Sequence, residues 1–353
     1  MPYVQTVLGP VDSSTITQVL PHEHLLSLTP GPWLSGGPNS PSSDRPDVDN
    51  GYSQLIADDQ VTTAVGALGH LNALGINTVV DLSPFGVVGR DDHGANVVLL
   101  RRIAEETGLN IVTGTAVYLE SFSPPWTVSA TLSELTERFI ADITTGIDGT
   151  DIKAGILGEQ ATSLNHITSH EEKCLRAAGR AQCETGLTLY THTTHGSMAL
   201  EQIAILRQEG CELGRVIIGH VDTHPDTDYV RDVLRTGVNV AFDTIGKQHW
   251  DFRVEPADPK QPDGDYKKDA YKRSDLTRAD RIASLVREGF ANQIQLAHDI
   301  TGSEVYLNPD THGQWGYSYL SMKFVPLLMD RGVTDQQVHQ MMRSNPLATL
   351  EIG

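Results

Sequence analysis

The stretch Ile16–His24, ITQVLPHEH, combines a strand-like apolar run with two histidines at its end. Side chains alternate between the two faces of a β-strand, so His22 and His24 point the same way and Glu23 points to the opposite face. Two imidazoles directed at one point make up half of a typical metal site. The stretch therefore predicts a strand that ends in two metal ligands, although alone it also fits a strand with two unrelated histidines.

Seven more short apolar runs with strand character follow, separated by helical patterns. They lack polar alternation, which is typical of strands buried on both faces of a parallel sheet. These runs lie at residues 77–81, 110–115, 154–158, 187–191, 215–219, 239–243 and 293–297. Eight strand–helix units favour a (β/α)8 TIM barrel of the α/β class, formed as a single domain by residues 1–353. An open doubly wound sheet is the alternative, but no G-x-G-x-x-G motif follows the first strand to support it.

Two of the expected helices have recognisable ends. Ser169 with Glu172 three residues later fits a capping box at a helix start, and Gly186 predicts where this helix stops. The next helix is expected to run from 197 to about 208 and to end at Gly210. Both helices fall between predicted strands, as a barrel requires.

Three stretches rich in proline, glycine or polar residues interrupt the alternation, at 29–56, 121–128 and 248–278. In a TIM barrel, the loops that follow the strands gather at the C-terminal face and shape the pocket. We therefore expect long pocket loops at these places, with a disordered linker as the competing interpretation of 248–278.

Composition narrows the range of partners. The 353 residues include 26 lysines and arginines against 45 aspartates and glutamates, a formal net charge of −19. This charge argues against binding to nucleic acid or to anionic membrane surfaces. The expected partner is a small-molecule substrate, and a homodimer is an open alternative to a monomer. No signal peptide is visible and no apolar run approaches the ~20 residues of a membrane span, so a cytoplasmic protein is expected. Cys174, Cys183 and Cys211 lack zinc-finger spacing and are expected to be reduced, small buried side chains.

Metal-type ligands also stand at the ends of four later strands. The additional ligands are Glu159, His192, His220 and Asp299. A lone histidine is usually a satisfied structural residue, but these residues and the first two all fall at the same ends of parallel strands. That end is where TIM-barrel enzymes carry their chemistry. The coincidence predicts a metal centre built from six side chains.

This constellation resembles the phosphotriesterase family of the amidohydrolase superfamily, over most of the chain. The motifs that carry the resemblance are LPHEHL at 20–25, GRD at 89–91, YTHT at 190–193, IGH at 218–220 and DTIGK at 243–247. The resemblance implies a binuclear centre with a metal-bridging hydroxide. It implies two divalent ions, zinc first with Mn²⁺, Co²⁺ or Fe²⁺ as alternatives. By this resemblance His22, His24 and Asp299 hold one ion, and His192 and His220 hold the other.

The ligand that joins the two ions has two candidates on the fourth strand. Many members of the family use a carboxylated lysine there, and this chain has both Lys153 and Glu159. Six residues of strand span roughly 20 Å, so only one of them can lie at the metal end. Lys153 precedes the apolar run and Glu159 follows it. We therefore expect Glu159 to be the bridging ligand.

Other polar residues near the strand ends suggest roles in catalysis and substrate binding. Asp299 is the expected catalytic base, because a metal-bound carboxylate can take a proton from the attacking water and pass it to the leaving group. Tyr118, Lys247 and Arg273, with Tyr271 beside the last, are candidate substrate contacts, although packing or surface solvation explains each equally well. The alternative for Lys247 is an ion pair with Asp243 or exposure to solvent. His298 should point to the opposite face from Asp299 and be structural, and exposed loop histidines are expected at His195 and His224.

Together these features predict a metal-dependent hydrolase of a carboxylic ester, lactone or amide. A phosphoester or phosphotriester hydrolase is the alternative within the same chemistry. A non-catalytic small-molecule-binding barrel is an alternative of another class, but a degenerate binder has no reason to keep every ligand and the base.

Overall fold

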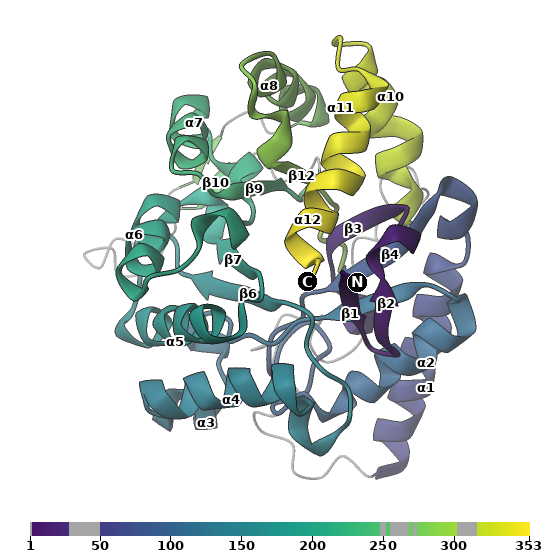
Figure 1. Ribbon diagram of the computed structural model, residues 1–353, viewed down its shortest axis with the longest axis vertical. Coiled ribbons are helices and arrows are strands. Elements are labelled where there is room, and N and C mark those ends of the chain that lie inside the picture. Colours follow the sequence, from purple (N-terminus) through teal and green to yellow (C-terminus); the bar gives the residue numbers. More distant parts are fainter. Residues whose placement is uncertain (1, 28–49, 248–251, 255–267, 271–273, 302–315) are drawn as a thin grey trace.

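The computed structural model describes residues 2–27, 50–247, 252–254, 268–270, 274–301 and 316–353. Within these residues, eight parallel strands form the inner layer (Figure 1). They are β3 (Gln18–Glu23), β4 (Ile76–Asp81), β5 (Asn110–Thr113), β6 (Leu157–Thr162), β7 (Leu189–Thr193), β8 (Val216–Ile218), β9 (Asn239–Phe242) and β12 (Ile294–Leu296). All eight correspond to the predicted apolar runs.

The strands close into a barrel. Pairing runs in the order β3-β4-β5 and β6-β7-β8-β9-β12, and a bridge between Gly114 and Ile156 joins β5 to β6. On the other side, the Asp299 N–H, just after β12, donates to the His22 carbonyl in β3 at 3.1 Å. The predicted (β/α)8 TIM barrel is therefore confirmed, and the open sheet is excluded because both edges are joined.

Helices form a ring around the strands, except α12, which runs towards the middle of the barrel beside the two chain ends (Figure 1). They are α1 (Asn50–Leu68), α2 (Val98–Thr107), α3 (Pro125–Ser129), α4 (Leu132–Thr144), α5 (Ser169–Thr185), α6 (Ala199–Glu209), α7 (Thr227–Arg235), α8 (Asp275–Arg287), α10 (Val325–Met329), α11 (Asp335–His339) and α12 (Asn345–Leu350). Their apolar faces and the outward faces of the strands bury the larger of two core clusters. Among the described residues, no helix has the length and apolarity needed to cross a bilayer.

The smaller core cluster fills the barrel interior at the N-terminal ends of the strands. Inward side chains such as Val80, Val112 and Ile217 pack there against Val4 and Leu350. Val4 belongs to β1 (Tyr3–Thr6), which forms a hairpin with β2 (Gly9–Asp12), and Tyr3 pairs with Ile352 near the other terminus. Both chain ends thus lie together and plug this end of the barrel with apolar groups.

Several local predictions need correction. The N-cap of α5 is Thr168 with Glu171 as its partner, one residue before the predicted capping box, because Thr168 is extended and Ser169 is already helical. The helix does end at Gly186, and α6 ends at Gly210; both glycines adopt positive φ.

The three predicted loops are shorter than expected. Helix α1 already begins at Asn50, and Pro125 starts the short helix α3 inside the second loop. In the third, β10 (Phe252–Val254) pairs with β11 (Lys268–Ala270), and Ser274 caps α8. This pairing argues against a plain linker, and the remaining parts of the first and third loops lie outside the described residues.

Candidate active site

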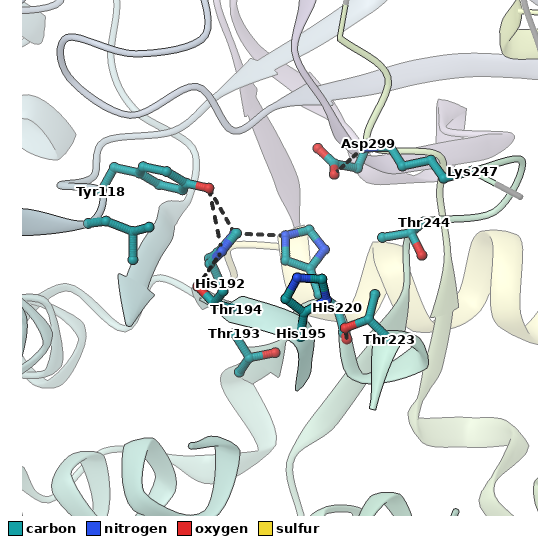
Figure 2. A pocket seen from close by; sticks show the side chains of 11 residues that line it. Tyr118, His192, Thr193, Thr194, His195, His220, Thr223, Thr244, Lys247 and Asp299 are labelled. Carbon is teal, nitrogen blue, oxygen red and sulfur yellow. Dashed lines mark hydrogen bonds and ion pairs between the residues drawn. The ribbon is translucent and has the colours of Figure 1, made fainter. Parts of the chain in front are cut away.

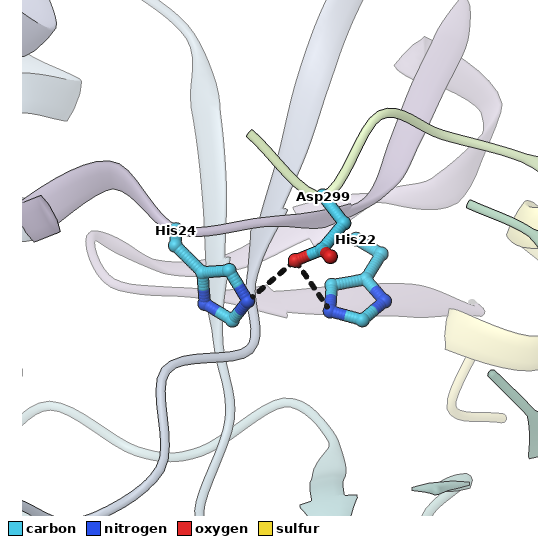
Figure 3. A group of neighbouring side chains, drawn as sticks. All are labelled: His22, His24 and Asp299. Carbon is cyan, nitrogen blue, oxygen red and sulfur yellow. Dashed lines mark ion pairs between the residues drawn. The ribbon is translucent and has the colours of Figure 1, made fainter. Parts of the chain in front are cut away.

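The six predicted metal ligands lie together at the C-terminal end of the barrel. Asp299 Oδ1 lies between two imidazoles, 2.9 Å from His24 Nε2 and 3.6 Å from His22 Nε2 (Figure 3). His22 also belongs to a second group, with Glu159 and His220, in which the donor atoms lie within 4.8 Å of one another. His22 and His24 lie on the same side of the chain, as the strand period predicts.

Glu159 reaches both parts of this cluster. Its Oε1 atom lies 3.4 Å from His24 Nε2, and its Oε2 atom lies 3.2 Å from His192 Nδ1 and 3.5 Å from His220 Nε2. Lys153 lies before β6, next to Ala154, whose N–H donates to the Asp142 carbonyl. Only the glutamate therefore takes part in the described cluster.

The second nitrogen of each imidazole also has a partner. Asp243 binds two rings, with its Oδ2 2.8 Å from His22 Nδ1 and its Oδ1 2.9 Å from His220 Nδ1. His24 Nδ1 lies 3.2 Å from Ser83 Oγ, and His192 Nε2 lies 3.2 Å from Thr194 Oγ1. Such contacts fix the ring and its tautomer, so that the other nitrogen presents a lone pair.

Sequence reasoning missed these supporting residues. It considered Asp243 only as a partner for the Lys247 loop, whereas the structure places its carboxylate against His22 and His220. No motif in the sequence points to Ser83 or Thr194. The available signal was their position: all three follow the C-terminal ends of strands that neighbour a predicted ligand.

The donor set fits divalent cations. His22 Nε2 is buried without a hydrogen-bond partner, although its ring is fixed through Nδ1. Burial alone would lower the pKa of His22, but the carboxylates of Glu159 and Asp243 outweigh it and raise the pKa to about 10. The site therefore attracts positive charge to this nitrogen, and a metal ion can supply that charge because imidazole and carboxylate are common ligands of zinc and its neighbours.

The chain segment that carries Asp299 is anchored from the opposite face. The His298 ring donates from Nδ1 to Glu23 Oε1 at 2.8 Å, and the Ile300 N–H donates to Glu23 Oε2 at 3.0 Å. The Leu320 N–H donates to His298 Nε2. His298 is structural, as predicted, and Glu23 has a positioning role that the sequence did not reveal.

A cavity of roughly 340 Å³ opens beside the cluster. Figure 2 shows Tyr118 on one side and Lys247 with Asp299 on the other, with His192 and His220 between them. The Lys247 ammonium lies 2.5 Å from Asp299 Oδ2, so this lysine neither pairs with Asp243 nor simply faces solvent. Burial and the neighbouring carboxylates raise the pKa of Tyr118 well above its ordinary value, so its hydroxyl stays a donor.

The remaining residues that the sequence suggested near the site have different outcomes. His195 lines the cavity, so its prediction as an exposed loop residue is wrong. His224 is half-buried and stacks on Tyr229, so the prediction of an exposed residue is wrong here as well. Arg273 and Tyr271 lie outside the described residues.

Known proteins show the same architecture. Residues 2–350 match the model of the Phosphotriesterase family. The chain belongs to this family. It is 33% identical to the Phosphotriesterase homology protein of Escherichia coli over 253 residues, which cover 72% of this chain and 78% of that protein. It is 28% identical to the N-acetyltaurine hydrolase of Rattus norvegicus over 357 residues, covering 97% and 96% of the two chains. A mutant organophosphorus hydrolase from Deinococcus radiodurans superimposes with a TM-score of 0.78 at 30% identity, covering 99% of this chain and 96% of that chain.

This phosphotriesterase-family protein is therefore a metal-dependent hydrolase, and the non-catalytic barrel is set aside.

Its pocket wall is held by a buried ion network behind the cavity. Arg278 donates to Asp222 at 2.7 Å, to Asp275 at 2.8 Å and to Thr244 Oγ1 at 2.8 Å. Asp275 in turn accepts from the Gly246 N–H. The network fixes the segment that carries Lys247, and no sequence motif indicates it.

Three threonines that line the cavity have hydroxyl groups that already donate hydrogen bonds within the protein. The Thr193 hydroxyl donates to the Gly219 carbonyl and the Thr194 hydroxyl to the Thr162 carbonyl. Thr244 likewise donates to Asp222. Because these protons are committed to the protein, a ligand meets mainly methyl groups and oxygen lone pairs from these residues.

Proposed function

We propose that this chain is a binuclear metal-dependent hydrolase that cleaves a carboxylic ester, lactone or amide carrying a second, anionic group. The observation that carries the binuclear reading is the position of Glu159, whose two oxygens face different imidazoles. Zinc is the first choice for such donors, with Mn²⁺, Co²⁺ or Fe²⁺ as alternatives. When bound, two divalent ions supply an acidified water and a Lewis acid for the substrate carbonyl.

The six candidate ligands would be shared between two metal ions. His22, His24 and Asp299 would hold one ion and His192 and His220 the other, with Glu159 shared. Asp299 is proposed to take the proton from the attacking water and deliver it to the leaving group. Burial alone would raise the pKa of Asp299, but the Lys247 ammonium and nearby imidazoles hold this pKa well below its ordinary value, so the carboxylate is ionised.

Lys247 supports an anionic substrate group. It lines the cavity beside Asp299, while three of the cavity's threonines donate their protons to the protein. Tyr118, across the cavity, can donate a second hydrogen bond. In a protein with a net charge of −19, a local cation is needed to hold an anion near the cluster.

The relatives agree with this substrate class. Several are N-acetyltaurine hydrolases, whose named substrate is an amide that carries a sulfonate. A structural neighbour derives from a weak promiscuous lactonase and superimposes with a TM-score of 0.77 at 29% identity, over 99% of each chain. These names support an amide or a lactone as the scissile group, and the N-acetyltaurine hydrolases also support an anionic group on the substrate.

Phosphoester or phosphotriester hydrolysis is the second candidate. A solved structure of the Escherichia coli Phosphotriesterase homology protein is described as complexed with phosphate in its active site, and it superimposes with a TM-score of 0.74 at 28% identity, covering 96% of this chain and 100% of that chain. A neutral phosphotriester, however, has no use for a cation on the cavity wall.

A matched substrate screen tests the proposal. Purified protein of known metal content is assayed with an N-acyl amino acid, an N-acyltaurine, their neutral amide counterparts, a lactone and an aryl phosphotriester. We expect the anionic amides, or a lactone that carries a carboxylate, to have the highest kcat/KM. Preferred turnover of the neutral phosphotriester would favour the second candidate instead.

A further inference from the structure

Two of the three cysteines meet where α5 and α6 end. Cys183 Sγ, in the last turn of α5, lies 3.5 Å from the Glu209 carbonyl at the end of α6. Cys211 Sγ, just after α6, lies 3.5 Å from the Gly179 carbonyl, one turn before Cys183. Each sulfur thus contacts the backbone that carries the other, which places the two thiols side by side.

The approach of Cys211 explains a glycine inside a helix. Glycine in a helix interior costs about 0.5–1 kcal/mol relative to alanine, yet Gly179 stands in the middle of α5. A methyl group at Gly179 would lie 3.0 Å from Cys211 Sγ and 3.4 Å from Glu209 Cβ. The missing side chain makes room for the Cys211 sulfur against α5.

The two thiols differ in access to solvent. Cys183 is exposed, whereas Cys211 is buried. Burial, followed by the neighbouring Cys183 thiol, raises the pKa of Cys211 to about 12. The prediction that all three cysteines are small buried side chains is therefore wrong for Cys183, and an oxidant from solvent reaches this sulfur first.

We propose that Cys183 and Cys211 form a redox-sensitive dithiol that closes to a disulfide by exchange with a small disulfide such as oxidised glutathione. The Cys183 thiolate attacks one sulfur of the small disulfide and releases the first thiol. Cys211 then loses its proton to solvent, attacks the Cys183 sulfur and releases the second thiol. The protein loses two hydrogens, and the small disulfide is reduced to two thiols.

The Cys183–Cys211 disulfide would cross-link the two ends of one βα unit of the barrel without contacting the candidate metal ligands. The closed loop includes β7, which carries His192, and helix α6. A cross-link restricts the unfolded chain more than the folded one, so it stabilises the folded state. We therefore expect higher thermal stability with unchanged turnover at low temperature.

The experiment uses the full-length, metal-containing protein incubated with reduced or oxidised glutathione. Peptide mapping without reductant should find a Cys183–Cys211 cross-linked peptide, with a mass loss of two hydrogens and two fewer titratable thiols. The Tm should rise on oxidation of the unmodified protein and of Cys174→Ser, but not of Cys211→Ser.

Two results would overturn the proposal. One is a stable mixed disulfide of glutathione with Cys183 while Cys211 remains a free thiol. The other is a disulfide that joins Cys183 to a second copy of the chain, seen as a dimer on a non-reducing gel. Cys183→Ser and Cys211→Ser should both be folded at room temperature, which is checked by circular dichroism before either result is interpreted.

Discussion

At the C-terminal end of the barrel the six candidate metal ligands lie together, whereas at the N-terminal end Val4, Ile16 and Leu350 close the interior with apolar groups. The same eight strands pass through both ends. Chemistry and stability are therefore supplied by different ends of one set of strands, and a substitution at either end should affect mainly one of them.

The two ends also differ in how their side chains are held. At the apolar end, packing alone fixes the side chains, and a replacement of similar volume is tolerated. At the polar end, every ligand imidazole is fixed by a specific partner, such as Asp243 for His22. Buried polar groups without partners cost free energy, so this end should tolerate substitution far less well.

The largest effect is expected from removing a ligand on either side of Glu159. His22→Ala or His192→Ala should lower the bound metal below the unmodified protein's content, for which we expect two ions per chain, and should reduce turnover to the detection limit. Elemental analysis together with a hydrolysis assay measures both quantities. Full activity in protein that carries no metal would contradict the mechanism.

The second prediction compares two substitutions, one within strand β6 and one just before it. Glu159→Ala should remove the shared carboxylate and abolish turnover, whereas Lys153→Ala, before β6, should leave kcat/KM nearly unchanged. If Lys153→Ala is inactive and bicarbonate stimulates reconstitution of metal-free protein, the lysine is the bridging ligand and the assignment fails.

The third prediction concerns a residue that touches the ligands but is not expected to bind metal. Asp243→Asn should weaken the orientation of His22 and His220 and reduce metal affinity or kcat by about 10–100-fold. Ser83→Ala, which removes a contact to one ring, is the milder companion. Metal titration followed by an activity assay measures both losses. If Asp243→Asn loses no more metal affinity or kcat than Ser83→Ala, the proposed role of Asp243 in orienting both His22 and His220 is refuted.

Much of the fold and the clustering of the candidate ligands could be predicted from the sequence because both follow from local rules. Buried parallel strands give continuous apolar runs, and the residue after each run falls at one end of the barrel. This reasoning brought His22, Glu159 and Asp299 to one place without any tertiary information. The start of α5 was misplaced by one residue because two overlapping capping boxes fit the same spacing.

The supporting contacts could not be predicted because they join segments far apart in the chain. Asp243 meets His22 across the barrel, and Glu23 meets His298 from the far end of the sequence. The sequence suggests Lys247 only as a candidate substrate contact, and its pairing with Asp299 depends on where two loops end in space. Pairing of this kind follows from closure of the barrel, which no local pattern records.

The fourth prediction tests the proposed cation on the cavity wall. Lys247→Met should reduce kcat/KM for an anionic amide by about 2 kcal/mol, or ~30-fold, because a partly buried charge loses its partner. Lys247 also contacts Asp299, so some loss is expected on every substrate, and the ratio of anionic to neutral kcat/KM isolates the ion pair. Lys153→Met is the matched control, and an equal loss on both substrates rules out anion recognition.

The smallest effect on catalysis is expected at the apolar end. Leu350 is only 3% exposed and packs with Val4 and Ile16 under the strands. Leu350→Ala should lower the free energy of unfolding by about 2–4 kcal/mol through the lost burial and the cavity it leaves. Urea denaturation measures that loss, while kcat and metal content at low temperature should match the unmodified protein. A proportional fall in kcat would show that packing at the closed end sets the geometry of the ligands, and the division between the two ends would then fail.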